Sequence, residues 1–385
     1  MITTINNKHK KLNVPNLRFP EFQGEWEEER LSDIADLYKG TGISKDQLSE
    51  EGEPCILYGE LYTKYKSETI EKVISKTNIE NTKLVRSKAN DVIIPCSGET
   101  AEDIATTRCV LNDNILLGGD LNIIRLHGYD GTFMSYQLNG KRKYDIAKVA
   151  QGVSVVHLYG EHLKGVKTIN PCLTEQKKIA SLLTLLDERI ATQNKIIDKL
   201  QSLIKGIAQH CIRELINGWE YVRLGDICKI TTGKLDANAQ VENGQYPFFT
   251  CAELPFNIDS YAFNTEALLI SGNGANLGYI NYYKGKFNVY QRTYVLDHFS
   301  VNIQYVKWAL KVLLPQRIAI EKSSSNTPYI VLSTLADLKI PIPNKSKQNS
   351  IANLMLSFER KLSNQLALRD LYHKQKQYML RQMFI

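Results

Sequence analysis

The chemistry-bearing residues of this 385-residue chain lack the spacing of common catalytic motifs. Neither a GxxxxGKS/T phosphate loop nor a GxSxG nucleophile motif occurs, and no HExxH zinc motif is present. His157 and His162 lack the company of other metal ligands. The segment Asn170-Pro171-Cys172 departs at its third position from the Asp/Asn-Pro-Pro-aromatic motif of amino-methyltransferases. The sequence therefore predicts a chain that is not itself an enzyme.

A glycine-rich segment, Gly272–Gly278, resembles a dinucleotide-binding fingerprint and follows the apolar run Ala267–Ile270. A Rossmann turn must open a helix whose N-terminus faces the phosphates. Here Tyr279–Tyr283 favours a strand, and we expect a hairpin that turns at Lys284-Gly285 and returns through Phe287–Leu296. A turn or a DNA-facing loop is the better interpretation of the glycines.

Several glycine-bearing polar loops offer the side chains that read DNA. Arg and Lys bind guanine edges, Asn and Gln bind adenine edges, and Lys, Ser, Thr and Tyr contact phosphates. The candidate DNA-binding residues are Lys39, Thr41, Lys45, Lys64, Lys66, Ser97, Thr100, Thr107, Arg108, Ser154, Lys234, Asn238, Asn273, Asn276, Gln291, Arg292, Tyr294, Lys322, Ser324 and Asn326. A solvated polar loop explains any one of them, so the prediction depends on the whole set.

Two long helices are predicted to position these loops. Residues 173–216 carry apolar side chains in alternating steps of four and three, which is typical of a coiled-coil seam. Residues 344–385 align without a gap with the first helix when 172 is added to the residue numbers of the first helix. The predicted seam residues are Ile179, Leu183, Leu186, Ile190, Gln193, Ile197, Leu200, Ile351, Met355, Phe358, Leu362 and Gln365. Arg369 and Lys376 also fall on the seam, where we expect the second helix to splay or to face another protein.

The chain is a tandem repeat, because its front ends match as well. Trp26 and Trp219, which are 193 residues apart, each open a similar segment ahead of a globular body. We expect a mixed α/β fold of two similar bodies, separated by two helices that form an antiparallel coiled coil with pseudo-twofold symmetry. The expected bounds are a leader at 1–23, a first body at 24–171, a first helix at 172–217, a second body at 218–343 and a second helix at 344–385.

The composition of the chain indicates which kinds of partner and which cellular compartment to expect. The net charge of +7 permits a polyanionic partner without proving one. The odd count of 7 cysteines contains no CxxC pair, which favours free thiols in a reducing cytoplasm over zinc or disulfides. No apolar run approaches the roughly 20 residues of a membrane span. We therefore expect a cytoplasmic protein.

The chain resembles the specificity subunits of bacterial type I restriction–modification systems. One set of residues that carries the resemblance is Trp26-Glu27, Leu31 and Asp33-Ile34, repeated as Trp219-Glu220, Leu224 and Asp226-Ile227. The other set is Pro171 with Glu175-Gln176 and Ile179-Ala180, repeated as Pro343 with Gln348 and Ile351-Ala352. Lys347 replaces the glutamate in the second copy.

The resemblance implies two target-recognition domains that read a bipartite double-stranded DNA site with a spacer set by the helices. It implies two modification subunits, which carry S-adenosylmethionine and methylate adenine, and two restriction subunits, which use ATP and magnesium. The chain itself would bind no cofactor and no metal. Glu175, Lys178, Asp187 and Arg189 would be candidates for docking those partners. A subunit of a related combined system and a coiled-coil scaffold that binds no DNA remain alternatives.

Overall fold

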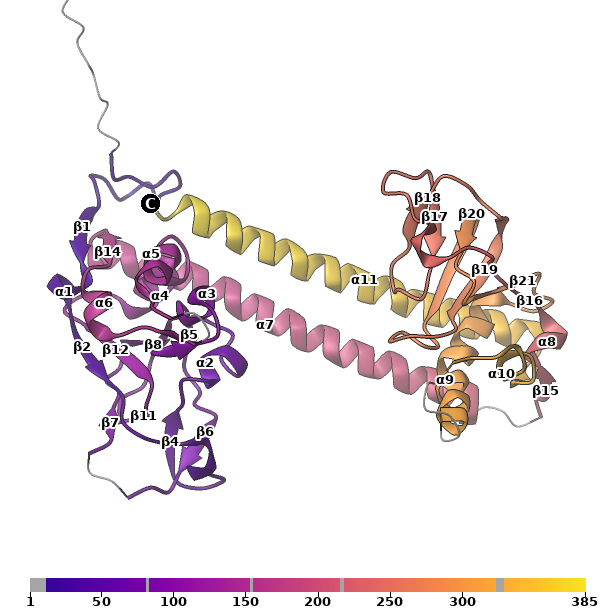
Figure 1. Ribbon diagram of the computed structural model, residues 1–385, viewed down its shortest axis with the longest axis horizontal. Helices are drawn as coiled ribbons and strands as arrows, with labels where there is room; N and C mark the ends of the chain where they lie inside the picture. The colour runs from indigo at the N-terminus through magenta and orange to yellow at the C-terminus, as the bar shows by residue number, and fades with distance from the viewer. Residues whose placement is uncertain (1–11, 81–82, 153–154, 215–217, 323–328) are drawn as a thin grey trace, which may run out of the picture. The chain divides into compact units, whose positions relative to one another are not determined.

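The computed structural model describes residues 12–80, 83–152, 155–214, 218–322 and 329–385. The chain folds as two units, one made of residues up to 194 together with 368–385, the other of residues 195–367 (Figure 1). Each of the two long helices, α7 (Leu173–Gln209) and α11 (Lys345–Gln382), contributes residues to both units. None of the described helices is long and apolar enough to cross a membrane.

Unit one is built on two mixed five-stranded sheets. The first has the order β2 (Ala35–Lys39), β12 (Leu121–Leu126), β8 (Asp91–Pro95), β10 (Arg108–Val110) and β5 (Thr69–Ile70). The second has the order β3 (Leu48–Ser49), β6 (Ser75–Thr77), β4 (Glu53–Ile56), β11 (Leu116–Leu117) and β7 (Val85–Arg86). Two further pairs join β1 (Glu27–Arg30) to β14 (Lys167–Asn170) and β9 (Ser97–Gly98) to β13 (Val156–His157). The short helices are α1 (Leu31–Ile34), η1 (Lys45–Gln47), α2 (Glu60–Thr63), α3 (Ala101–Ile104), α4 (Gly131–Asn139), α5 (Lys143–Val149) and α6 (Gly160–Lys164).

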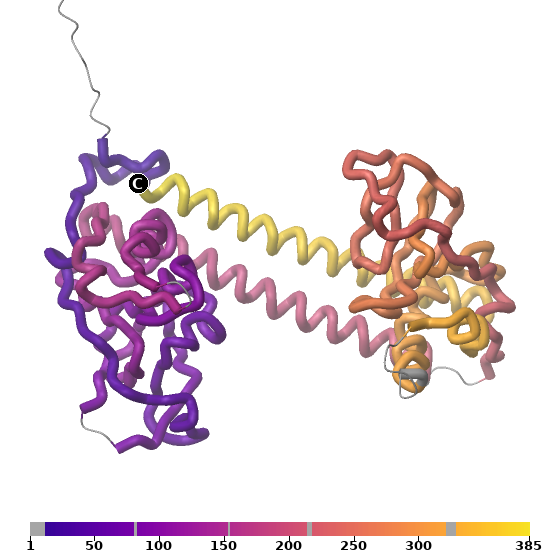
Figure 2. The backbone as a smooth tube through the Cα atoms, in the orientation of Figure 1, coloured from indigo at the N-terminus to yellow at the C-terminus, as the bar shows by residue number. Residues whose placement is uncertain are grey.

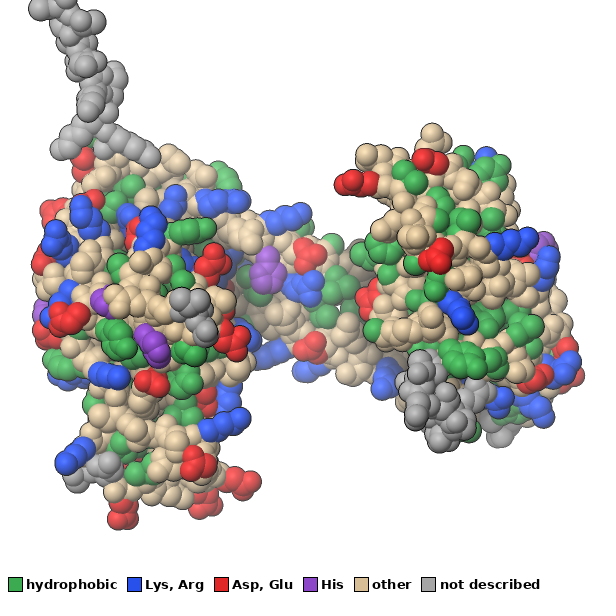
Figure 3. Space-filling model, viewed as in Figure 1, with side chains coloured by type: hydrophobic (Ala, Val, Ile, Leu, Met, Phe, Trp, Pro, Cys, Tyr) green, Lys and Arg blue, Asp and Glu red, His purple; other side chains and the backbone are tan. Residues whose placement is uncertain are grey.

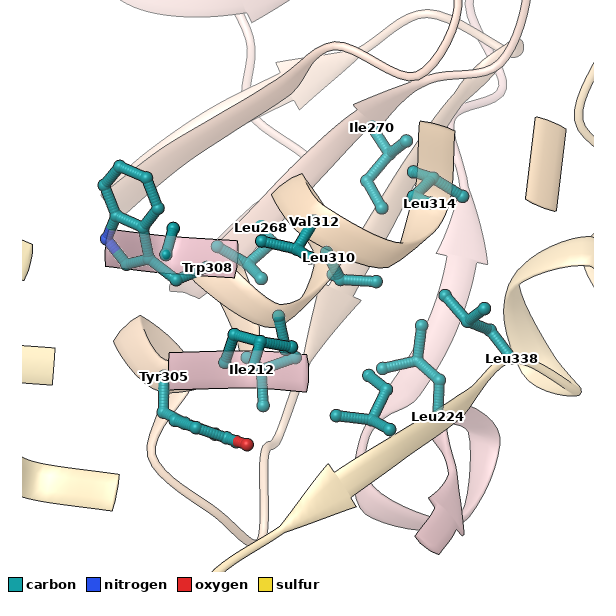
Figure 4. Close-up of a cluster of buried hydrophobic side chains, with 14 of the residues drawn as sticks. Ile212, Leu224, Leu268, Ile270, Tyr305, Trp308, Leu310, Val312, Leu314 and Leu338 are labelled. Atoms are coloured by element: carbon teal, nitrogen blue, oxygen red, sulfur yellow. The ribbon is translucent and has the colours of Figure 1, made fainter. Parts of the chain in front are cut away.

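Unit two has one six-stranded sheet. Its order is β16 (Lys229–Thr232), β21 (Thr293–Asp297), β19 (Phe263–Ser271), β20 (Ile280–Val289), β17 (Tyr246–Phe249) and β18 (Phe256–Ile258). A separate pair joins β15 (Glu220–Arg223) to β22 (Lys339–Ile342), and the helices are α8 (Leu224–Ile227), η3 (Ala237–Ala239), α9 (Ile303–Lys322) and α10 (Leu332–Ala336). Side chains of α9 and β19 meet in its core, together with Ile212 from the turn of π-helix at His210–Glu214 that follows α7 (Figure 4).

The two predicted long helices are present, and strands cover Ala267–Ile270 and most of Tyr279–Tyr283, but the predicted hairpin at Lys284-Gly285 is wrong. Strand β20 runs straight through these residues and pairs with β19, with Thr265 opposite Gly285. Gly285 has φ +138°, which a glycine adopts without leaving the strand. The turn that joins β19 to β20 is the glycine-rich segment Gly272–Gly278, so these glycines open no helix.

The predicted antiparallel coiled coil is confirmed by the packing inside each unit. In unit one, Ile179 and Leu183 near the start of α7 share a core with Met383 and Phe384 at the end of the chain. In unit two, Leu200 and Ile204 near the end of α7 share a core with Ile351 and Met355 near the start of α11. The predicted seam residues Leu186, Ile190, Gln193 and Ile197 are buried, whereas Phe358, Leu362 and Gln365 are half-buried.

A buried glutamine explains why the same signature occurs twice. The Gln176 side chain donates to the Pro171 carbonyl at 2.8 Å and accepts from the Asp130 amide at 2.9 Å. Gln348 makes the same two contacts, donating to the Pro343 carbonyl and accepting from the Asn302 amide, each at 2.9 Å. Asp130 and Asn302, which cap α4 and α9, are themselves 172 residues apart (302 minus 130). Each long helix is thus fastened by one side chain to the start of a core helix.

The C-terminal end of the chain belongs to unit one, where Figure 2 traces it back beside the segment that precedes β1. The Leu17 amide donates to the Gln382 carbonyl at 2.9 Å, and the Phe384 ring stacks on Phe133 at 5.1 Å between centroids. Met383 and Phe384 are therefore buried in the core of unit one.

Lys376 does not splay the seam as expected. Its ammonium contacts the carboxylates of Glu68 at 2.8 Å and Asp187 at 2.6 Å, and all three side chains are mostly buried. Asp187 also accepts from the Tyr136 hydroxyl at 2.6 Å. Burial raises the pKa of Glu68, while the nearby ammonium opposes that shift. The lysine instead holds α11 and α7 against the body of unit one.

Replacing Gln176 by leucine should destabilise unit one. The variant leaves the Pro171 carbonyl and the amide that begins α4 without their partner, which costs about 2–4 kcal/mol. Thermal unfolding should show a lower Tm for Gln176→Leu. Gln375→Leu, at an exposed position on α11, is the matched control and should stay within about 0.5 kcal/mol of the parent. Equal melting of the two variants would contradict the fastening role.

Removing the Lys376 ammonium should cost about 3–5 kcal/mol, because two buried carboxylates would then face each other without a cation. Chemical denaturation of Lys376→Ala measures this loss, with Lys374→Ala at an exposed position as control. The triple variant Glu68→Gln, Asp187→Asn, Lys376→Met removes all three charges together and should recover most of the lost stability. A triple variant no more stable than Lys376→Ala would show that the ion cluster is not the cause.

Candidate nucleic-acid interface

In unit one, three neighbouring strands bring their loops to one edge of the sheet. Lys39, at the end of β2, lies opposite Asn122 near the start of β12, which in turn lies opposite Ile94 near the end of β8. The loops beyond are bonded to each other, since the Gly40 amide donates to the Leu121 carbonyl at 2.8 Å and the Cys96 amide to the Asp120 carbonyl at 2.7 Å. The predicted residues Lys39, Thr41 and Ser97 therefore share this edge. The Thr41 hydroxyl is engaged within the fold, since it donates to the Lys83 carbonyl at 3.0 Å and accepts from the Val85 amide at 3.2 Å.

Unit two repeats the arrangement with different side chains. Tyr294, near the start of β21, lies opposite both Thr232 at the end of β16 and Ile270 near the end of β19. The Gly272 amide donates to the Arg292 carbonyl at 2.8 Å, and the Gln291 amide donates to the Leu235 carbonyl at 2.9 Å. The segments around Lys234, Asn273 and Arg292 are thus joined into one surface.

A glycine at the same place in each copy allows the loops to come this close. A Cβ on Gly40 would lie 2.1 Å from the Gly118 carbonyl oxygen, and one on Gly233 would lie 2.0 Å from the Val289 carbonyl oxygen. The two glycines are 193 residues apart (233 minus 40), the same offset as Trp26 and Trp219. We call the edge at Gly40 and its counterpart at Gly233 the loop edges of the two units.

Most of the other predicted residues of unit one are engaged within the fold. Lys45 is exposed on η1. Lys64 contacts Glu60 at 2.6 Å and Ser75 at 2.7 Å, and Lys66 donates to the Tyr62 carbonyl at 2.9 Å. The Thr100 hydroxyl caps α3 by accepting from the Asp103 amide at 3.0 Å. Three of these four side chains already have internal partners.

Two predicted DNA contacts need correction. Thr107 has no exposed surface, and its hydroxyl bonds with Ser135 and Asn139. Arg108 lies in strand β10 rather than in a loop, is 9% exposed, and donates to the Tyr65 carbonyl at 3.1 Å. Burial lowers the pKa of the Arg108 guanidinium. Both side chains hold the interior together and present nothing to a phosphate.

In unit two, Lys234, Asn238, Gln291 and Arg292 are exposed. Asn273 and Asn276 are half-buried and shape the loops instead: Asn276 donates to the Cys251 carbonyl at 3.0 Å, and Asn273 accepts from the Cys251 thiol at 3.0 Å. The Tyr294 hydroxyl donates to the Ile330 carbonyl at 2.9 Å. Predicted positions outside the described residues are Ser154, Ser324, Asn326 and the side chain of Lys322.

Three of the four residues suggested for docking partners are engaged within unit one. Glu175 is 1% exposed and pairs with Arg18 at 2.8 Å, and this hydrogen bond raises the pKa of Arg18. Lys178 pairs with Glu21 and lies 4.6 Å from the Phe19 ring centroid. Asp187 belongs to the Lys376 cluster described above. Arg189 is exposed.

Aromatic side chains that the sequence does not indicate lie beside Ser97. The Tyr62 hydroxyl donates to the Ser97 carbonyl at 3.1 Å, and the Ser97 hydroxyl lies 3.3 Å from Nδ1 of His157. Tyr159, which is 49% exposed, stacks near His157 at 6.1 Å between centroids. Applying the 193-residue offset to the glycines would have identified the loop edge, but no spacing in the sequence links Tyr62 to Ser97.

Basic and acidic side chains are interspersed on the face of both units that Figure 3 shows, so the charge of +7 forms no single patch on this face. Contact with a polyanion there depends on individual loop residues. The geometry thus defines a protein with two copies of one scaffold, each presenting a variable set of polar loops at the same sheet edge.

The model of the type I restriction modification DNA specificity domain matches this chain twice, over residues 23–202 and 216–368. The chain belongs to that family. It is 43% identical over 134 residues to the EcoDI type I restriction enzyme specificity subunit of Escherichia coli, a match that covers 35% of this chain and 30% of that subunit. It is 22% identical over 386 residues to the MjaVIII specificity subunit of Methanocaldococcus jannaschii, covering 89% of this chain and 87% of that one.

Solved structures share the fold. The S subunit of a type I restriction–modification system from M. genitalium superposes with a TM-score of 0.69 at 18% identity, covering 97% of this chain and 99% of that one. A chain from a structure that describes complex assembly and conformational transition of a type I system gives 0.57 at 17% identity, with the same coverage.

Replacing Gly40 by alanine should distort the loop edge of unit one, because the new methyl group meets backbone that cannot retreat. We expect a loss of about 1–3 kcal/mol in stability and weaker DNA binding at one half of the site. Calorimetry and filter binding measure the two effects. Gly42→Ala, whose Cβ meets nothing within 4 Å, is the matched control. Identical behaviour of the two variants would contradict the need for close approach.

Proposed function

We propose that this chain is the DNA-reading subunit of a type I restriction–modification complex. Each unit reads one half of a bipartite double-stranded site, and the sequence between the halves is left unspecified. The observation that carries the proposal is the duplicated loop edge, with Gly40 and Gly233 at equivalent places and different side chains around them. Membership of the DNA specificity family supports it.

The side chains at the two edges suggest different targets. Unit two offers Arg292 and Gln291, which suit guanine and adenine edges in the major groove. Unit one offers Lys39 and the hydroxyl of Ser97, which suit a guanine or phosphates. Two unlike half-sites follow from two unlike sets of loops on one scaffold.

The chemistry then belongs to partner subunits. Two modification subunits would carry S-adenosylmethionine and methylate adenine, and two restriction subunits would use ATP and magnesium to translocate and cleave. The chain would direct these activities without catalysing them. The names of the relatives as type I restriction enzyme specificity subunits support this division of labour. The same DNA-reading role would serve in a related combined restriction–modification system with a different nuclease partner.

Methylation mapping of the source strain with and without this gene tests the proposal. Deletion should abolish N6-methyladenine at one bipartite motif, while other methylated motifs stay unchanged. A methylome without any such loss, in a strain whose modification subunit is expressed, would contradict the DNA-reading role and favour a scaffold that binds no DNA.

Arg292→Ala should relax or lose recognition of one half-site and leave the other half unchanged. A lost bidentate contact to guanine costs about 1–3 kcal/mol, roughly 5- to 150-fold in affinity. Binding of the chain, co-expressed with a modification subunit, to duplexes altered in one half at a time measures this. Lys229→Ala, at the opposite end of strand β16 from the loop edge, is the charge-matched control. An equal loss in both halves would place Arg292 outside base readout.

A further inference from the structure

A groove on the helical side of unit two has a composition that the reading of DNA does not explain. It has a volume of about 440 Å³ and lies between the last turns of α7, helix α9 and Leu362 of α11. Ile204, Val312, Pro315 and Leu362 give it an apolar floor, and Trp308 forms part of its wall. Every lining residue belongs to unit two.

The charges around the groove have one sign. Lys205, Arg213 and Lys311 line it, and no Asp or Glu is among its lining residues. Lys205 is exposed and makes no ion pair within the described part of the chain. Lys311 is 38% exposed and contacts Glu359 outside the lining at 3.3 Å. A ligand in the groove would therefore meet an excess of positive charge.

Two residues that line the groove also carry buried hydrogen-bond donors without an acceptor among the described residues. The indole nitrogen of Trp308 is buried, in a residue that is 5% exposed, and has no acceptor among the described residues. The same holds for Nε of Arg213, whose Nη2 donates to the Val312 carbonyl at 3.2 Å. Both nitrogen atoms are buried, so a ligand in the groove would meet the surfaces of these residues rather than the two donors themselves. In Figure 4 the Trp308 ring lies on the outer side of the buried cluster, away from Leu224 and Leu338.

We propose that this groove binds an acidic amphipathic helical segment of another protein. Leucine-like side chains of the segment would cover the apolar floor, and its carboxylates would meet Lys205, Arg213 and Lys311. An apolar floor bounded by helices fits a peptide helix with anchors at i, i+3, i+4 and i+7. A DNA backbone would leave the floor uncovered. The proposal goes beyond DNA recognition and does not depend on it.

The position is particular to unit two. Adding 172 to the residues of unit one places Tyr136 at Trp308 and Asn139 at Lys311. The Tyr136 hydroxyl is already satisfied by Asp187, and the Asn139 side chain bonds with Thr107. Unit one therefore lacks the cation that Lys311 supplies in unit two, and of the two unit-two side chains only the Trp308 indole has no acceptor among the described residues.

Peptide binding to the full-length chain tests the proposal. The probe is a fluorescein-labelled 20-residue helix of leucine and glutamate with leucine at i, i+3, i+4 and i+7, and its affinity is read by fluorescence anisotropy. Lys205→Glu should weaken binding at least about 10-fold, whereas Lys199→Glu, an equal charge reversal at an exposed position on α7 outside the groove, should change it less than about 2-fold. A lysine–leucine helix of the same pattern should not bind.

A second measurement locates the peptide. In chain labelled with 5-fluorotryptophan, the fluorine resonance of Trp308, assigned with Trp308→Phe, should shift on adding the peptide, while those of Trp26 and Trp219 stay in place. Equal weakening by Lys205→Glu and Lys199→Glu, or an unmoved Trp308 resonance, would overturn the proposal. Displacement of the peptide by a duplex oligonucleotide, together with weaker DNA binding by Lys205→Glu, would assign the groove to nucleic acid instead and overturn it too.

Discussion

The seam between α7 and α11 is the constraint on which the rest of the structure depends. Each helix supplies apolar side chains to both units: Leu183 and Met379 to the core of unit one, and Ile204 and Met355 to that of unit two. Neither body can bury its own apolar surface without a helix that begins or ends in the other. The core of each unit therefore depends on both long helices, although each loop edge is built by the sheet of its own unit.

Both copies of the repeat place a carboxylate on a long helix and pair it with a lysine, but the lysine comes from a different element in each copy. Asp187 and Glu359 are 172 residues apart (359 minus 187), one on each long helix. In unit one the carboxylate meets Lys376 from the other long helix, at 2.6 Å. In unit two it meets Lys307 from α9 at 2.8 Å. A half-buried carboxylate needs a cation, but the fold does not prescribe which element provides it. This freedom lets the two copies diverge while the frame stays the same.

The sequence was enough to predict the features that depend on local periodicity and on the repeat. The steps from Ile179 to Leu200 indicated the seam, and the repeated Pro and Gln positions indicated equivalent helix starts. Features set by distant residues were not predictable. In the sequence, Arg108 has the appearance of a basic loop residue, but it lies in strand β10 and donates to the Tyr65 carbonyl. Lys376 has the appearance of a defect in the seam, but it pairs with Glu68, which is 308 residues away in the sequence. The prediction of a turn at Lys284-Gly285 was wrong because a glycine with φ +138° also fits within a long strand.

The place of the final residues has a consequence for synthesis of the chain. Phe384 and Met383 lie in the core of unit one with Trp26 and Phe133, so that core is missing two of its members until residues 383 and 384 have been synthesised. At roughly 5–20 residues per second, the first body waits on the order of 10–40 s on the ribosome with this apolar surface uncovered. Unit two needs nothing beyond residue 367 and can close earlier. Unit one is therefore the first to be synthesised in part, but its core is completed after that of unit two.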